Sequence, residues 1–234
     1  ITAIQSVGRV IEQYTSAGGL KPSQIHTMGF GGFVSVDGKG KDTLHNFPLS
    51  LDSNRPFAQS CDEVVAQYMS CISRCELSGP TNFAELIQAT KKKLAKRPYT
   101  PTFQHYTILM IITDGDVTDF TETVKQICKS ADNAMSIIIV GVGNHNFALM
   151  NRLDADENPL SYNGKKCVRD MVQFVPLIKH IKNPHELAAV TLQEIPQQVM
   201  EFMKIRNIDA MPRPVVAVAA APPPGQPMMM APAP

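Results

Sequence analysis

The sequence lacks the features that would place it at once in a membrane, on a nucleic acid or in a common enzyme class. No apolar run approaches the roughly 18 residues that cross a bilayer. The 22 basic and 21 acidic side chains leave a formal net charge of +1, which gives no global electrostatic reason to expect a nucleic-acid partner. The motifs GxxxxGKS/T, GxSxG and HExxH are absent. With 44% apolar and 18% charged residues, the composition favours a soluble globular domain, and no motif calls for an enzyme.

A secretory signal is also absent. The five cysteines include no CxxC pair. Cys71 and Cys75 are spaced i,i+4 on a predicted helix, where small buried apolar groups are favoured over half of a metal site. We therefore expect reduced thiols and a cytoplasmic, reducing compartment.

The C-terminal end differs in composition from the rest of the chain. Residues 211–234 contain eight of the 18 prolines and a single charge. Because proline fixes φ and has no backbone donor, this stretch is predicted to be extended. We divide the chain into a folded domain, residues 1–207, and a Pro/Ala/Met-rich disordered tail, residues 208–234. The tail is interpreted as a linker, with a ligand for proline-recognition domains as the alternative.

Apolar periodicity predicts an open α/β sheet with helices on both faces. Two almost unbroken apolar runs, 106–113 and 135–142, are typical of parallel strands buried on both faces. Shorter strands are expected at 24–30, 44–51 and 172–177. Helices are expected over 4–14 and 124–131 and after the capping signals at Ser60, Asn82 and Asn183. The helix that follows Asn183 is expected to kink at Pro196. Ligands of such sheets bind at the rim formed by the carboxyl ends of the strands.

Two loops at this rim carry candidate ligands. Asp114 directly follows the strand 106–113 and precedes a glycine that permits a sharp turn. Thr81 lies in the loop 79–82, just before a predicted helix. An ordinary turn aspartate and a simple helix cap are the structural alternatives for these two loops. Together, a hydroxyl and a carboxylate suit a hard cation such as Mg²⁺, Mn²⁺ or Ca²⁺, whereas the lack of paired Cys or His nearby argues against zinc.

Four longer motifs are more specific than any single residue. They are GPTNF at 79–83, IITDGDVTD at 111–119, MSIIIVGVGNHNF at 135–147 and RDMVQFVPL at 169–177. In this order they resemble the von Willebrand factor A-type domain of copines, and the similarity extends over about residues 2–203.

The resemblance implies a von Willebrand factor A-like, Rossmann-like and mostly parallel sheet of six strands, with a metal-ion-dependent adhesion site at its rim. Such a site uses three loops, and Thr81 and Asp114 match the second and third. The first, an Asp-x-Ser/Thr-x-Ser loop, has no counterpart, and we expect it to lie upstream of Ile1 with the first strand, which is missing here. One hydroxyl and one carboxylate leave most coordination positions to water, so we expect weak or undetectable binding of Mg²⁺ or Mn²⁺ by this chain alone.

The resemblance also implies a function. Copines are cytosolic proteins that move to membranes when calcium rises, and two phospholipid-binding modules precede their partner-recruiting A-type domain. We therefore expect protein partners at the metal rim, where an acidic side chain of the partner completes the coordination. We expect phospholipid to bind to modules absent from this chain, with calcium-dependent recruitment from the cytoplasm to the plasma membrane. The alternative is the A-type domain of a copine-related RING-type ubiquitin ligase, although no Cys or His follows Met203 to build a zinc-binding module.

Overall fold

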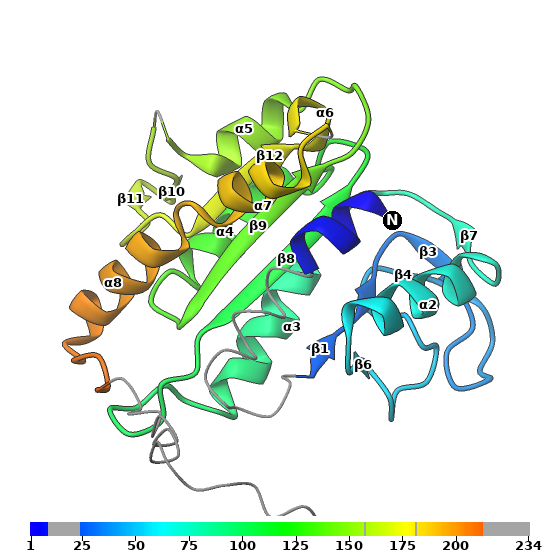
Figure 1. Ribbon diagram of the computed structural model, residues 1–234, viewed down its shortest axis with the longest axis horizontal. Coiled ribbons are helices and arrows are strands. Elements are labelled where there is room, and N and C mark those ends of the chain that lie inside the picture. Colours follow the sequence, from blue (N-terminus) through cyan, green and yellow to red (C-terminus); the bar gives the residue numbers. More distant parts are fainter. Residues whose placement is uncertain (9–23, 157, 181, 213–234) are drawn as a thin grey trace, which may run out of the picture.

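The computed structural model describes residues 1–8, 24–156, 158–180 and 182–212 (Figure 1). Its central sheet has three parallel strands in the order β12-β9-β8, namely β8 (Thr107–Thr113), β9 (Met135–Gly141) and β12 (Val172–Pro176). Every residue of β9 is buried, as expected for an apolar strand with a neighbour on each side. The three predicted strands and the α/β fold class are confirmed.

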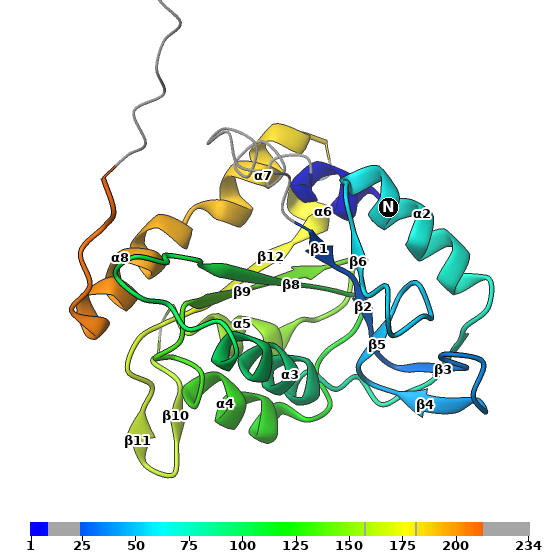
Figure 2. The ribbon, with the colours of Figure 1, turned by 90° about the horizontal axis from the view of Figure 1, so that it is seen from below.

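Helices cover both faces of this sheet (Figure 2). One face is covered by α3 (Ala84–Ala95), α4 (Phe120–Cys128) and α5 (Ala148–Asp154), whose buried side chains pack against Ile137 and Ile139 of β9. The other face carries α6 (Leu177–His180), α7 (Pro184–Leu192), α8 (Ile195–Arg206) and the helical segment 2–8, which surround Ile138 and Val140. Successive side chains of β9 therefore pack into two hydrophobic cores on opposite faces of the sheet, as expected of a β-strand.

The N-terminal part of the fold is a set of short antiparallel pairs beside α2 (Cys61–Ile72). β1 (Ile25–His26) pairs with β6 (Phe57–Ala58), β2 (Met28–Gly29) pairs with β5 (Phe47–Pro48), and β3 (Gly32–Val34) lies between β4 (Asp42–Leu44) and β7 (Glu76–Leu77). The strand predicted over 24–30 is therefore two short strands. They separate at Thr27, whose backbone and hydroxyl bind loop and helix residues instead of a strand.

One edge of the central sheet is open in the part of the chain that the structure describes. β8 pairs with β9 along one side and with no described strand along the other. Where the resemblance implies six strands, the described parallel sheet has three, and the predicted strands over 24–30 and 44–51 lie in separate small sheets.

Two of the predicted helix starts have the expected caps. The Ser60 hydroxyl accepts a hydrogen bond from the Glu63 amide at 3.1 Å, and the Glu63 carboxylate accepts one from the Gln59 amide at 2.7 Å. Asn183 Oδ1 accepts a hydrogen bond from the Glu186 amide at 3.2 Å at the start of α7. Residues 2–8 of the first predicted helix are helical, and residues 9–14 lie outside the described residues.

The predicted kink at Pro196 is wrong. The chain instead forms two helices, since α7 ends at Leu192 and α8 begins at Ile195. Pro196 falls in the first turn of α8, where a missing backbone donor removes no intrahelical hydrogen bond. The proline begins a helix rather than bending one.

The expectation that all cysteines are reduced is also wrong for two of them. Cys128, the last residue of α4, forms a disulfide with Cys167, which precedes β12. Their Cα atoms are 4.7 Å apart although the residues are 39 positions apart in the chain. Cys71 is buried, as predicted, and Cys75 is partly buried. A disulfide between distant residues leaves no spacing signal in the sequence.

Only the start of the predicted tail is described, because residues 213–234 lie outside the described residues. Gln104 holds this start in place: its amide nitrogen donates to the Asp209 carbonyl at 2.6 Å, and its amide oxygen accepts from the Met211 amide at 2.9 Å. Of the helices that the structure describes, none is both long and apolar enough to span a membrane.

Candidate functional site

The loop 79–82, called the threonine loop below, lies between β7 and α3 and is held against the loop that follows Asp114. The Thr81 amide donates to the Thr118 hydroxyl at 3.1 Å, and the Thr118 amide donates to the Thr81 carbonyl at 2.8 Å. Thr81 is half-buried. Two segments 37 residues apart in the sequence are thus joined at the carboxyl end of β8.

Asp114 follows the last residue of β8 and is exposed. The neighbouring Thr113 hydroxyl donates to the Gly115 carbonyl at 3.0 Å and accepts from the Gly115 amide at 3.3 Å. These two bonds turn the backbone sharply directly after the strand. The structure therefore places Asp114 at the predicted end of a parallel strand, in the loop that contacts the Thr81 segment.

Asp116 is a further carboxylate of the same loop. Its Oδ2 accepts a hydrogen bond from the Leu149 amide at 3.1 Å, in the first turn of α5. Its Oδ1 is buried and has no hydrogen-bond partner among the described residues. A buried carboxylate oxygen without a donor is costly, so this atom is a candidate oxygen ligand that the sequence analysis did not assign.

A fourth residue, Asp119, positions the threonine loop. Its carboxylate accepts hydrogen bonds from the Phe83 and Ala84 amides, each at 3.0 Å, and from the Thr123 hydroxyl at 2.9 Å. It therefore caps the N-terminus of α3 from a different segment. The predicted cap at Asn82 is wrong, because α3 starts one residue later and has no cap from its own side chains.

The rim offers the kind of ligands that a hard cation binds, but few of them. Thr81 supplies a hydroxyl, Asp114 an exposed carboxylate and Asp116 a buried carboxylate oxygen. Each of these groups could bind a metal ion through oxygen. These residues fit Mg²⁺, Mn²⁺ or Ca²⁺ in chemistry, and they fall short of the six or more oxygens that such ions take. Weak binding of a divalent cation by this chain alone stays a prediction.

A polar cleft of 240 Å³ adjoins this rim between α3 and α4. Its lining includes Asn82 and Glu85 from the start of α3 and Asp119 and Glu122 from the start of α4. The cleft therefore lies next to the threonine loop and is lined by polar side chains.

Replacing Asp119 by alanine is expected to destabilise the protein by about 2 kcal/mol, because the α3 cap and the Thr123 contact are both lost. Asn82→Ala is the matched control and is expected to change the free energy of unfolding by less than about 0.5 kcal/mol. Urea unfolding of both variants measures the difference. A larger loss in Asn82→Ala than in Asp119→Ala would contradict this capping assignment.

Comparison with known proteins gives a consistent result. The family model described as Copine matches residues 1–211. The chain is 41% identical to Copine-C of Dictyostelium discoideum over 226 residues, which cover 96% of this chain and 40% of that protein. It is 42% identical to Copine-A of the same organism over 202 residues, which cover 86% of this chain and 32% of that protein. It is also 42% identical to Copine-E of that organism over 207 residues, which cover 88% of this chain and 34% of that protein. The chain therefore spans about a third to two fifths of the length of these relatives, and it belongs to the copine family.

Proposed function

We propose that this chain is the partner-recruiting domain of a copine, and that Thr81 and Asp114 bind a divalent cation at the rim. The observation that carries the proposal is the reciprocal pair of hydrogen bonds between Thr81 and Thr118. This pair holds the threonine loop against the loop that begins with Asp114. Mg²⁺ or Mn²⁺ is the proposed ion, with Ca²⁺ as a further candidate.

The proposed ion would bind an acidic side chain of a protein partner. Thr81 contributes a neutral hydroxyl and Asp114 a single negative charge, so the ion keeps net positive charge and open coordination positions. A carboxylate from a partner would supply both a negative charge and an oxygen for an open coordination position. Asp116, whose buried Oδ1 lacks a donor, supports the local negative potential that attracts the cation.

The membrane part of the function is proposed for the whole protein only. We propose that modules outside this chain bind phospholipid when calcium rises, and that the protein then moves from the cytoplasm to the plasma membrane. The role proposed for this chain is recognition rather than catalysis.

The test uses the full-length protein, because the chain alone is predicted to bind Mg²⁺ weakly. Partners are captured in Mn²⁺ and in EDTA with the wild type and with Asp114→Ala. Capture is expected to require Mn²⁺ and to fall roughly tenfold or more in Asp114→Ala, since losing a charged ligand costs more than about 1.4 kcal/mol. Asp132→Ala removes an exposed carboxylate elsewhere and serves as the control.

Two results would contradict the proposal. Capture that persists in EDTA, or that is equal in the wild type and in Asp114→Ala, would indicate a scaffold domain with an inactive metal site. Calorimetric titration of the chain alone tests the predicted weak binding separately. Low-micromolar Mg²⁺ affinity that vanishes in Asp114→Ala would show that the chain alone already holds a complete site.

A further inference from the structure

A short hairpin between α5 and β12 lies beside α4 (Figure 2). Its strands are β10 (Ser161–Tyr162) and β11 (Lys165–Lys166), and residues 158–168 are called the arm below. The chain is anchored on both sides of the arm. The Asp154 carboxylate accepts a hydrogen bond from a backbone amide of β12 at 2.7 Å, and the Arg169 guanidinium donates to four backbone carbonyls.

Little besides one disulfide joins the arm to the rest of the described chain. Its hydrogen bonds among the described residues stay within the arm, including that from the Cys167 amide to the Leu160 carbonyl at 2.8 Å. The described ion pairs include no residue of the arm. Leu160 and Cys167 are partly buried and pack against the hydrophobic core. The Cys128–Cys167 disulfide then fastens the arm to the end of α4.

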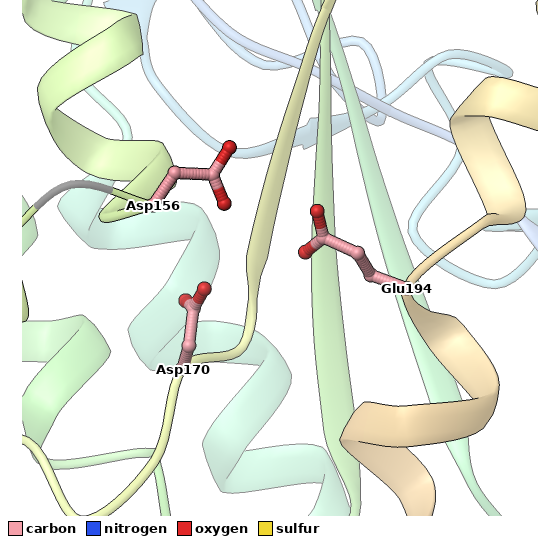
Figure 3. Close-up of side chains that lie close together, drawn as sticks. All are labelled: Asp156, Asp170 and Glu194. Atoms are coloured by element: carbon pink, nitrogen blue, oxygen red, sulfur yellow. The ribbon is translucent and has the colours of Figure 1, made fainter.

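Charge repulsion at the base of the arm acts against this arrangement (Figure 3). Asp156 comes just before the arm, and one of its carboxylate oxygens lies within 4.8 Å of one from Asp170 and one from Glu194. Burial, followed by repulsion from Asp156 and Asp170, raises the pKa of Glu194 to about 7. Moving the arm away would separate Asp156 from the other two carboxylates, which favours its release once the disulfide is broken.

The surroundings of the disulfide suit thiol–disulfide exchange. Cys128 and Cys167 are only partly buried, so a small thiol can approach them. Lys129 and Lys166 are their neighbours in the chain, and both lysines are exposed and take part in no ion pair among the described residues. Positive charge near a cysteine favours its thiolate, which is the reactive form in exchange.

We propose that Cys128 and Cys167 form a reversible thiol–disulfide site, which holds the arm against α4 when oxidised and releases it when reduced. Repulsion between Asp156 and the two carboxylates beside it favours the released state. This inference does not rest on the proposed rim function.

The proposed reductant is a dithiol. Its thiolate attacks one sulfur of the disulfide, the S–S bond breaks, and a mixed disulfide forms. The second thiol of the reductant then displaces the cysteine from the mixed disulfide. Two electrons and two protons pass to Cys128 and Cys167, and the dithiol becomes a disulfide. A small-molecule disulfide, such as glutathione disulfide, reverses the exchange and restores the cross-link.

The experiment measures hydrogen exchange by mass spectrometry in the 234-residue chain, oxidised and after treatment with dithiothreitol. A two-stranded hairpin has little stability by itself in water, so the amides of the arm depend on docking for protection. They should exchange at least roughly tenfold faster after reduction. The amides of β9, which is buried throughout, should stay protected over the same minutes of labelling. Glutathione disulfide should restore the protection of the arm.

Three variants separate the disulfide from other causes. Cys128→Ser should show fast exchange in the arm with and without reductant. Cys75→Ser is the matched control and should respond like the wild type, because Cys75 is a free cysteine. Asp156→Asn relieves the repulsion, so its reduced form should exchange more slowly in the arm than the reduced wild type.

Equal exchange of the arm in the oxidised and reduced wild type would overturn the proposal. Loss of protection in the arm and in β9 together would also overturn it, because reduction would then unfold the domain instead of releasing the arm. Alkylation followed by mass spectrometry shows whether dithiothreitol reduces the bond in the folded chain. Reduction that requires a denaturant would make the bond a permanent cross-link, against the proposal. Equal exchange in reduced Asp156→Asn and the reduced wild type would contradict the part assigned to repulsion.

Discussion

Replacing Arg169 by methionine is expected to lower the free energy of unfolding by about 4 kcal/mol, which corresponds to a fall of roughly 10 °C in Tm. Arg169 is buried, and its guanidinium donates to four backbone carbonyls, those of Ala131 (2.8 Å), Asn133 (3.0 Å), Met135 (2.6 Å) and Asp170 (3.1 Å). Methionine fills much of the volume and donates nothing. Each carbonyl then loses a donor where water does not reach it easily, although the Asn133 carbonyl keeps the Met135 amide at 2.8 Å.

The carbonyls that Arg169 binds explain why the effect is large. Three of them belong to the turn between α4 and β9 and to the first residue of β9, while the fourth lies just before β12. Arg169 thus binds the backbone at the start of β9 and just before β12, which are adjacent strands. Its guanidinium also lies over the Phe202 ring at 5.9 Å, which connects α8 to the same point.

Urea unfolding measures the Arg169→Met effect, with Arg55→Met as the matched control. Arg55 is exposed, and its replacement should change the unfolding free energy by less than about 0.5 kcal/mol. A loss below about 1 kcal/mol in Arg169→Met would mean that its four hydrogen bonds contribute little, against the structure.

Removal of the Cys128–Cys167 disulfide should have the second-largest effect. The bond closes a loop with a sequence separation of 39, and the chain-entropy relation gives about 3–4 kcal/mol for a loop of that length. Cys128→Ser should therefore lower Tm by roughly 10 °C under oxidising conditions. Adding a reductant to the wild type should lower Tm by a similar amount and should leave Cys128→Ser unchanged.

Cys75→Ser is the control for this measurement, because Cys75 takes no part in the disulfide. It should retain the sensitivity of the wild type to reductant. A wild-type Tm that is insensitive to reductant, while mass spectrometry shows the bond broken, would contradict the predicted stabilisation. The reduced form is the relevant one if the protein works in a reducing cytoplasm.

The sequence predicted those parts of the fold that local patterns specify. The strands β8, β9 and β12 follow from apolar runs, and the caps at Ser60 and Asn183 involve residues within a few positions of each other. The rim was predicted because Asp114 directly follows a strand. Such features depend on spacing, and spacing is visible in one sequence.

Features that depend on distant contacts could not be predicted. The α3 cap comes from Asp119, which lies 36 positions after Phe83, so Asn82 looked like the better cap from the sequence. The disulfide joins residues 39 positions apart. The carboxylates of Asp156, Asp170 and Glu194 come from three loops and lie close together. Only the arrangement of the strands and helices brings these groups together.

The most direct test of the account is whether Thr81 and Asp114 act on the same ion. Mn²⁺ is titrated into the full-length protein. Thr81→Ala, Asp114→Ala and the double variant are compared in a double-mutant cycle. We predict that each single change weakens Mn²⁺ binding roughly tenfold or more and that the double variant binds little worse than Asp114→Ala alone. Unchanged affinity in either single variant, or fully additive losses, would contradict a shared ion at the rim.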